Sequence, residues 1–296
     1  MMKTSPDRSG GVLPQGARVA IIAGSGSLPR DVVDALVRSG HRPVVVAIEG
    51  EADWIGEEPR DFDVWPVPAE RLGLVLPRLK KEGITHLVLA GGVSRRPPLL
   101  KVRFGLDVFK VLPKLVAAYA KGDDGLLRSV ISYIESNGIT VLGAHEIAPD
   151  LLAPAGVLTR ARPTAGDRAD LAAAHEAAHA IGALDIGQAA IAVGGRAVAL
   201  EGIEGTAGLL ERMQALRDHG RLAGKKRGVL VKCVKPQQEV RADLPTIGPE
   251  TVDAAHAAGL AGIGVEAGRS LIIDYAEAVR RADAHGLFII GLEEKP

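Results

Sequence analysis

Short apolar segments alternate with amphipathic segments in the first half of the chain, and this alternation constrains the fold more than any other feature. Val19–Ala23, Val44–Ile48 and Thr85–Ala90 are short apolar runs of the kind that form buried strands. Helical spacing of apolar residues occurs over Arg30–Arg38 and Arg71–Lys81. Strands that alternate with helices predict a parallel sheet covered on both faces, and such sheets bind ligands at the carboxyl ends of their strands.

The second half of the chain has a different pattern that includes an antiparallel pair. Ala189–Val193 and Ala197–Leu200 flank Gly194-Gly195, which is a hairpin signal. Helices are expected at Arg168–Ile181, Gly208–Leu216, Pro249–Ala258 and Tyr275–Ala284, and strands at Gly228–Val234, Gly262–Glu266, Ser270–Ile273 and Leu287–Ile290. The sequence therefore predicts an α/β protein in which an N-terminal Rossmann-like domain with a parallel sheet precedes a C-terminal mixed α/β domain.

Composition along the chain suggests where these domains begin and end. Residues 1–17 are polar and interrupted by glycine and proline, so we expect a flexible tail before an N-terminal domain at 18–147. Residues 148–163 contain three prolines and no clear period, which is typical of a linker, and the C-terminal domain would then occupy 164–296. Two helices, at Leu106–Ala120 and Leu126–Asn137, and a strand at Ile139–Leu142 complete the predicted N-terminal domain.

The charge and residue usage exclude several classes of function. The 36 basic and 36 acidic residues cancel, so no overall field attracts a nucleic acid, and 3% aromatic residues give few surfaces on which bases could stack. The one cysteine, Cys233, lies in the apolar run GVLVKCV, where we expect a buried and unreactive thiol. No apolar run is long enough to span a bilayer and no signal segment is visible, which favours the cytoplasm.

Glycine-rich turns follow two of the predicted strands. Gly24-Ser25-Gly26-Ser27-Leu28-Pro29 lies between a strand and a helix, where backbone N–H groups and the helix N-terminus can bind a phosphate. Pro29 stands where the dinucleotide fingerprint has its third glycine, and the lysine of a Walker loop is absent. The alternative interpretation is a plain tight turn. Gly91-Gly92 ends the third strand in the same manner.

Two acidic residues, Asp123 and Asp124, lie side by side between glycines. Adjacent carboxylates repel one another unless a cation or hydrogen-bond donors neutralise them, so this loop is a candidate cation ligand. A solvated turn in which Asp124 caps the helix near Leu126 explains the same residues without a cation.

A zinc-protease motif occurs in the Ala-rich helix of the second half. His175-Glu176-Ala177-Ala178-His179 matches H-E-x-x-H, which places two imidazoles on one helix face with a glutamate as general base. An ordinary packing helix is the alternative. A peptidase would bind zinc and lose activity when His175 is replaced, whereas the hydrolase hypothesis below predicts neither.

Acidic and basic residues gather near predicted strand ends and helix starts in the second half. They occur in DIGQ at 185–188, in EGIEGT at 201–206, at Arg212 and Lys232, and in KPQQEVRADLPTIG at 235–248. Cations beside carboxylates suit phosphoryl chemistry, in which positive groups offset charge on the transferring oxygens. Scattered surface salt bridges are the alternative, but scatter would not favour glycine-rich loops.

At these residues the chain resembles the LpxI-type UDP-2,3-diacylglucosamine pyrophosphatases of lipid A biosynthesis. The strings that carry the resemblance are AGSGSLP at 23–29, AGGVSRRP at 90–97, KGDDGLLR at 121–128, DIGQ, EGIEGT, KPQQEVRADLPTIG and GIGVEAG at 262–268. The resemblance implies a two-domain, Mg²⁺-dependent hydrolase of Gram-negative bacteria, peripheral on the cytoplasmic face of the inner membrane. Its substrate would be a lipid-linked UDP-sugar, cleaved to UMP and 2,3-diacylglucosamine 1-phosphate.

From the resemblance and the residue types we assign hypothetical roles. The catalytic candidates are Asp123, Asp124, Thr206, position 207, Lys232 and Asp243, and the candidate ligands of Mg²⁺ or another divalent cation are Asp124, Glu204 and Asp243. The candidate substrate-binding residues are Gly24, Ser25, Gly26, Ser27, Leu28, Gly91, Gly92, Val93, Gln188, Gly205, Arg212 and Lys235. The uridine is expected on the N-terminal domain, with Lys232, Lys235 and Arg212 near the phosphates.

The chain departs from the family pattern at two positions. Thr206 is followed by Ala207, whereas the family string reads E-G-T-D, so a carboxylate is missing. We hypothesise that the chain is an inactivated variant in which substrate still binds. Glu239 stands where the family usually has Asp, which preserves the charge. The alternatives to an active hydrolase are the zinc peptidase and a sugar-nucleotide-binding module without catalytic activity.

Overall fold

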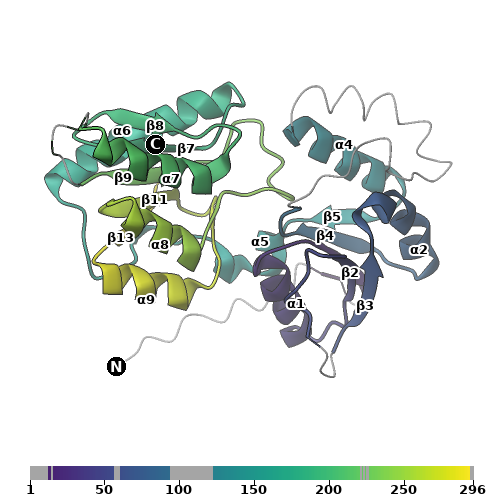
Figure 1. Ribbon diagram of the computed structural model, residues 1–296. Helices are drawn as coiled ribbons and strands as arrows, with labels where there is room; N and C mark the ends of the chain where they lie inside the picture. The colour runs from purple at the N-terminus through teal and green to yellow at the C-terminus, as the bar shows by residue number, and fades with distance from the viewer. Residues whose placement is uncertain are drawn as a thin grey trace, which may run out of the picture. The chain divides into compact units, whose positions relative to one another are not determined.

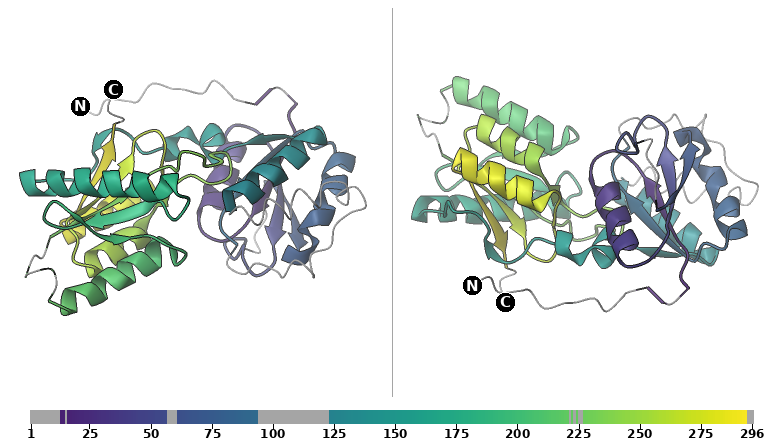
Figure 2. Two further views of the ribbon diagram at one scale, coloured as in Figure 1. Left: turned by 90° about the horizontal axis from the view of Figure 1, so that it is seen from above. Right: turned by 90° about the horizontal axis from the view of Figure 1, so that it is seen from below.

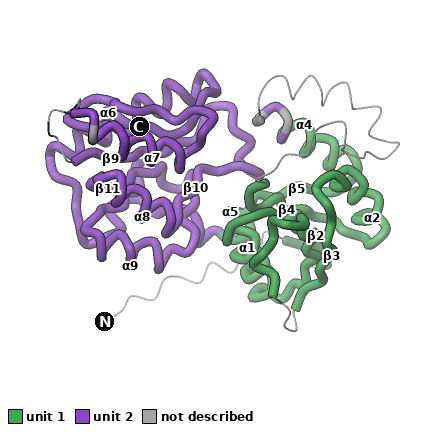
Figure 3. Tube along the Cα trace, viewed as in Figure 1, with its two compact units in different colours: residues 1–118, 128–148 green, residues 119–127, 149–296 purple. Residues whose placement is uncertain are grey.

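The computed structural model describes residues 13–14, 16–56, 61–93, 123–220, 222, 224 and 227–293. It divides into two compact units, one formed by residues 1–118 and 128–148, the other by residues 119–127 and 149–296 (Figure 3). Each unit contains its own sheet, the first parallel and the second mixed, which confirms the predicted fold class. The expected helix at Leu106–Ala120 lies outside the described residues, as does most of the predicted tail.

The sheet of the first unit has five parallel strands in the order β3-β2-β1-β4-β5 (Figure 1). Its strands are β1 (Val19–Ala23), β2 (Val44–Ile48), β3 (Asp63–Val67), β4 (His86–Ala90) and β5 (Thr140–Leu142). The strand β3 was not predicted, because its sequence DVWPV contains a proline and is only partly buried. Proline is tolerated there because β3 is an edge strand, where one side needs no ladder hydrogen bond.

Helices cover both faces of this parallel sheet. They are α1 (Leu28–Arg38), α2 (Val75–Lys81) with the preceding 3₁₀ turn η1 (Ala69–Leu74), α4 (Asp123–Ser136) and α5 (Ala144–Ile147). Of α4, residues 128–136 belong to this unit. From β1 the chain moves through α1 to β2 and then to β3, toward one edge of the sheet. The connections from β3 to β4 and from β4 to β5 run toward the other edge. Right-handed crossovers then put α1 on one face and α2 and α4 on the other (Figure 1). The strand order reverses between β1 and β4, so a ligand is expected at their carboxyl ends.

The second unit is built on a six-stranded mixed sheet in the order β6-β13-β11-β9-β7-β8. Its strands are β6 (Gly156–Val157), β7 (Ala189–Ala192), β8 (Ala197–Leu200), β9 (Val229–Lys232), β11 (Gly262–Glu266) and β13 (Phe288–Leu292). The predicted hairpin is confirmed, because β7 and β8 pair antiparallel. Two short parallel strands that make a separate ladder, β10 (Thr246–Ile247) and β12 (Leu271–Ile272), complete the unit, and β10 was not expected.

Strand directions bring several loop residues of the second unit to one edge of its sheet. β7 runs antiparallel to both β8 and β9, while β9, β11 and β13 are mutually parallel. The carboxyl ends of β8, β9, β11 and β13 therefore share one edge with the start of β7. Residues just beyond these ends, such as Glu201 after β8 and Gln188 before β7, lie close together for this reason.

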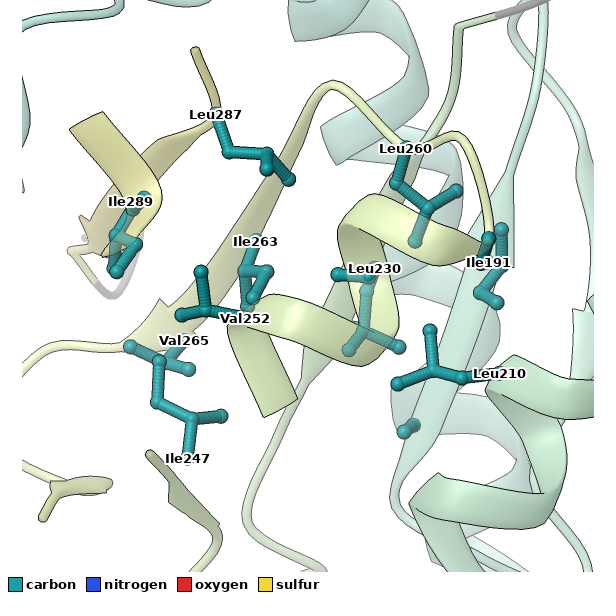
Figure 4. Packing of buried hydrophobic residues seen from close by; sticks show 14 of the residues in the cluster. Ile191, Leu210, Leu230, Ile247, Val252, Leu260, Ile263, Val265, Leu287 and Ile289 are labelled. Carbon is teal, nitrogen blue, oxygen red and sulfur yellow. The ribbon is translucent and has the colours of Figure 1, made fainter. Parts of the chain in front are cut away.

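Four helices enclose the second sheet: α6 (Ala165–Ala183), α7 (Gly205–Asp218), α8 (Pro249–Ala257) and α9 (Tyr275–His285). The helix α6 covers one face, and α7, α8 and α9 cover the other (Figure 2). Leu230 belongs to the core beneath α7–α9 (Figure 4), whereas Val229, Val231 and Cys233 pack in the core beneath α6. This alternation follows from the two-residue period of a strand, and it separates Lys232 from Cys233 by the thickness of the sheet.

The segment predicted as a linker carries structure of its own. Residues 149–151 form the 3₁₀ turn η4 (Pro149–Leu151), and β6 pairs antiparallel with β13. Such short elements leave no periodic pattern, so the prolines dominated the sequence signal.

None of the helices in the described part of the chain has the length and hydrophobicity of a membrane span.

Candidate active site

Two glycine loops of the first unit meet at the carboxyl ends of β1 and β4. The N–H of Gly24 donates to the carbonyl of Ala90 at 2.9 Å, and Ser25 and Gly92 exchange backbone hydrogen bonds of 2.8 and 3.1 Å. A Cβ atom on Gly24 would overlap the carbonyl of Gly92, so only glycine permits this approach. The N–H groups of Gly24, Ser25 and Gly92 are thus used within the protein, contrary to the expectation that they face a phosphate.

The start of α1 is the part of this loop that keeps donors for an anion. Gly26 has a φ of +88°, and Ser27 is the N-cap of the 11-residue helix without making a side-chain capping bond. The Ser27 hydroxyl oxygen is buried and has no hydrogen-bond partner among the described residues. The first N–H groups of a helix have no acceptor within the helix, so this turn can bind a phosphate group. Val93, the last described residue of the second loop, is exposed.

The second unit brings seven polar residues together where the carboxyl ends of its parallel strands lie. We refer to them as the polar cluster: Gln188, Glu201, Thr206, Lys232, Gln238, Asp243 and Thr246. Glu201 is 5% exposed and receives two hydrogen bonds of 2.7 Å, from the N–H of Gln188 and the hydroxyl of Thr206. A buried carboxylate needs such donors, because it loses its hydration on folding.

Lys232 is the buried cation of the polar cluster. Its ammonium group is at the end of β9 and donates to the carbonyl of Thr246 at 3.1 Å. Burial lowers the pKa of Lys232, while the charges of Glu201 and Asp243 act in the opposite direction. The ammonium group itself can offset the charge of an anionic group that binds beside it.

Gln238 connects the remaining members of the polar cluster. Its amide nitrogen donates to Asp243 at 2.8 Å and to the side-chain oxygen of Gln188 at 3.2 Å, and its amide oxygen accepts from the N–H of Lys235 at 2.9 Å. Glu201 and Gln238 were not predicted as site residues. Their position in glycine-rich polar strings was the available signal, but their burial becomes evident only when the strand ends converge.

Other predicted residues are engaged in ion pairs around the polar cluster. Arg212 contacts Glu204 at 2.7 Å and also donates to the carbonyl of Leu200, while Lys235 contacts Asp185 at 2.8 Å. Gly205, with a φ of +71°, begins α7 and allows the chain to turn into that helix. Ala207 is exposed in the first turn of α7. Asp123 and Asp124 begin α4, and their side chains lie outside the described part of the chain.

The carboxylates around the polar cluster differ in their fitness as Mg²⁺ ligands. Glu204 is paired with Arg212, which competes with a cation, whereas Asp243 has one oxygen bound to the neutral amide of Gln238. Among the residues that the structure describes, the one group of three or more metal-ligand side chains lies elsewhere, at His175, His179, Cys233 and Glu266. Protein Mg²⁺ sites commonly use one or two carboxylates together with substrate phosphates, so Asp243 fits this role.

Comparison with known proteins gives matches along almost the whole chain. Residues 18–151 match the family model of the LpxI N-terminal domain, and residues 154–290 match that of the LpxI C-terminal domain. The chain is 38% identical over 285 residues to a protein of Caulobacter vibrioides named UDP-2,3-diacylglucosamine pyrophosphatase LpxI. That alignment covers 94% of this chain and 99% of the relative.

Proposed function

The chain belongs to the LpxI family, and from this premise we propose that it is a hydrolase that cleaves the diphosphate of UDP-2,3-diacylglucosamine in lipid A biosynthesis. Water is consumed, and the products are UMP and 2,3-diacylglucosamine 1-phosphate. The observation that carries the proposal is the buried Lys232 between Glu201 and Asp243. Such an ammonium group can offset charge that develops on a diphosphate oxygen in the transition state.

Thr206 supports the attacking water in this proposal. Its hydroxyl hydrogen is committed to Glu201 at 2.7 Å, so the lone pairs of the oxygen remain to accept a hydrogen bond from water. Gln188 receives a hydrogen bond from Gln238 on its side-chain oxygen, which leaves its amide N–H₂ group as a donor toward an anion. These two residues would orient the water and the diphosphate without changing their own charge.

The proposal includes Mg²⁺ or another divalent cation as the cofactor. Asp243 is the described carboxylate that fits it, and Asp123 and Asp124 are retained as candidates from the sequence. When bound, the cation would neutralise diphosphate oxygens and lower the energy of the charged transition state. The uridine is proposed to bind at the carboxyl ends of β1 and β4, close to the start of α1, in keeping with the switch point of the parallel sheet.

Exposed apolar side chains close in sequence to the polar cluster support contact with a lipid. Five large ones, at the end of β8 or in loops, lie within four residues of a cluster member: Leu184, Ile186, Leu200, Ile203 and Val240. Ile203 is fully exposed at 107% of its reference area and lies between Glu201 and Thr206 in the chain. Exposed apolar groups in one region favour a lipid partner, so we propose peripheral contact with the cytoplasmic face of the inner membrane.

Because the family has Asp where this chain has Ala207, the proposal is tested both on the unaltered chain and on the variant Ala207→Asp. UMP release from UDP-2,3-diacylglucosamine with Mg²⁺ is measured for the chain as given and for Ala207→Asp. Activity in at least one form is expected, and Asp243→Asn in that form should reduce kcat by about 100-fold or more while substrate binding changes little. Substrate binding without UMP release in either form would instead support a binding module, and near-normal turnover of Asp243→Asn would remove Asp243 from the mechanism.

A further inference from the structure

Four side chains that commonly bind metals converge on the α6 side of the second sheet. His175 and His179 lie one turn apart on α6, Cys233 directly follows β9, and Glu266 ends β11. One ligand atom from each of the four lies within 4.8 Å of the others. This group, which we call the His-Cys-Glu cluster, is separate from the polar cluster, because Lys232 and Cys233 point to opposite faces of the sheet.

The two imidazoles point at the same carboxylate oxygen. Nε2 of His179 lies 2.9 Å from Oε1 of Glu266, and Nε2 of His175 lies 3.9 Å from that oxygen. The two rings are edge to face with centroids 4.5 Å apart, so both Nε2 atoms can approach one point. The histidine side chains are 37% and 39% exposed and that of Glu266 is 8% exposed, which gives an ion a path from solvent on the α6 side.

Neighbouring backbone groups fix the two buried members of this cluster. The second oxygen of Glu266, Oε2, accepts a hydrogen bond of 2.8 Å from the N–H of Val234, which leaves Oε1 turned toward the histidines. The N–H of Cys233 donates to the carbonyl of Gln188 at 2.9 Å, which positions its thiol. Partners that orient the ligands in this way are a regular feature of metal sites in proteins.

We propose that His175, His179, Cys233 and Glu266 form a zinc-binding site that joins α6 to the ends of β9 and β11. Two imidazole nitrogens, one thiolate and one carboxylate oxygen are a donor set that Zn²⁺ accepts in tetrahedral geometry. Zinc binding releases the thiol proton of Cys233 to solvent, and the imidazoles bind through unprotonated Nε2. The thiolate and the carboxylate then balance the charge of the dication, which suits a largely buried position.

With four protein ligands, the proposed site would stabilise the fold and would not catalyse a reaction. Catalytic zinc sites keep one position for water and use three protein ligands, whereas closed sites with four protein ligands stabilise the fold. This distinguishes the site from the H-E-x-x-H peptidase interpretation, in which Glu176 would activate a metal-bound water. Bound zinc therefore does not by itself indicate a peptidase, contrary to the expectation from the sequence. Zinc at Cys233 would also restrain the neighbouring Lys232 and Gln188, so the site would support the polar cluster from the opposite face of the sheet.

The site is tested on the full chain without a histidine tag. The protein is stripped with a chelator, incubated with Zn²⁺, separated from free metal and analysed for metal by mass spectrometry, and its Tm is measured with and without Zn²⁺. One Zn²⁺ per chain and a higher Tm are expected. Co²⁺ in place of Zn²⁺ should give the charge-transfer absorption of a thiolate ligand, and Cys233→Ser should abolish that band.

Variants distinguish this site from other zinc-binding positions. His179→Gln and Cys233→Ser should each lower zinc affinity by more than the roughly 10- to 100-fold that loss of an outer-shell partner costs. His256→Gln, an exposed histidine of α8, and Asp243→Asn in the polar cluster should keep the full zinc content. Absence of stoichiometric zinc in the unaltered chain, or unchanged zinc in the double variant His179→Gln/Cys233→Ser, would overturn the proposal whether or not the chain hydrolyses the UDP-sugar.

Discussion

The hydroxyl of Thr206 donates a hydrogen bond of 2.7 Å to the buried carboxylate of Glu201, which joins the first turn of α7 to the end of β8. The other carboxylate oxygen of Glu201 accepts from the N–H of Gln188, before β7. One side chain therefore connects three segments that are adjacent only in the folded sheet. Its negative charge also acts on Lys232, so Glu201 has both a structural and an electrostatic effect on the site.

Replacement of Glu201 by Gln should impair both stability and turnover. A Gln side chain has one acceptor oxygen and one donor amide group. Either the N–H of Gln188 or the hydroxyl of Thr206 would therefore lose its acceptor, at a cost of about 1–3 kcal/mol in the free energy of unfolding. Loss of the charge should reduce kcat by about tenfold or more through Lys232 and Thr206. Urea unfolding and UMP release measure the two effects, and Glu211→Gln on the exposed side of α7 is the control. Unchanged values for both would contradict the assigned role.

Lys232 gives the enzyme a specific response to high pH. Burial lowers the pKa of Lys232 below its ordinary value, so the ammonium group should lose its charge at a lower pH than an exposed lysine. Turnover should then fall on the alkaline side as Lys232 deprotonates, and Lys232→Arg should shift that fall to higher pH because arginine stays charged. A pH–rate profile of both proteins checks this, and identical alkaline limbs would refute it.

The free energy of unfolding should also depend on pH through Lys232, and the direction of the lysine's pKa shift gives the sign of that dependence. Because the folded pKa of Lys232 is lowered, the unfolded chain binds more protons between the folded pKa and about 10.4, so this lysine's penalty on folding decreases as pH rises through that window. Lys232→Met removes the titrating group, so the unfolding free energy of the unaltered chain minus that of the variant should rise as pH increases through this window. A difference that does not vary with pH would show that Lys232 titrates alike in both states.

The periodic part of the fold could be predicted from the sequence, because buried strands and amphipathic helices follow from local hydrophobic patterns. β1, β2 and β11 have the predicted bounds, whereas α1 begins two residues before the expected start. The short strands β6 and β10 are held by pairing with distant segments, which no local pattern records. Local patterns also do not locate a domain boundary, so the boundary at residues 148–163 stays a prediction.

Candidate site residues could be selected by type and by position near strand ends, but their connections could not. Lys232, Gln188, Thr206 and Asp243 come from separate strings, and their convergence depends on the strand order of the mixed sheet. Burial of Glu201 could not be seen in a string that also contains the exposed Ile203. Cys233 and Glu266 were likewise not associated with the His175 and His179 motif. Cys233 follows β9 and Glu266 ends β11, and only the order of the strands in the sheet brings these positions beneath α6.

Asp167 should make the second unit sensitive to acid. Burial alone would raise the pKa of Asp167, but hydrogen bonds from Arg227 and Thr164 and the charge of Arg227 outweigh it, so the pKa lies below the usual value. A carboxylate with a lowered folded pKa stabilises the fold at pH above its unfolded pKa of about 3.9, and this stability is lost as pH falls through the folded pKa.

Asp167→Asn should therefore cost about 1–3 kcal/mol of unfolding free energy near neutral pH and less in acid. Most of the cost should come from the cap at Thr164, because the Arg227 side chain is 61% exposed and its ion pair is screened by solvent. Arg227→Gln should cost less than Asp167→Asn in the same urea titrations. The reverse order would show that the ion pair, and not the cap, stabilises the start of α6.

Ile203 should contribute to lipid contact without contributing to the chemistry. Its side chain is fully exposed on the loop between β8 and α7, so Ile203→Glu should not affect packing. The variant should bind less to vesicles that contain anionic lipid and should turn over vesicle-borne substrate more slowly, because apolar area is replaced by a charge. Turnover of a detergent-dispersed substrate should be unchanged. Equal vesicle binding by the two proteins would show that Ile203 does not contribute to membrane contact.

Ala207→Asp tests whether the chain lacks a catalytic carboxylate. Position 207 is exposed in the first turn of α7 and next to Thr206, so an Asp side chain there would reach the region of the proposed water without displacing core residues. The helix N-terminus also favours a negative charge, with about 0.3–1 kcal/mol of added stability. If the carboxylate acts as a base or orients a water, UMP release should rise by about 100-fold or more. Ala207→Asn, of the same shape but uncharged, and Ala215→Asp, further along α7, should give no such rise. Measurable UMP release that is equal for Ala207→Asp and the unaltered chain would show that the reaction does not need a carboxylate at position 207.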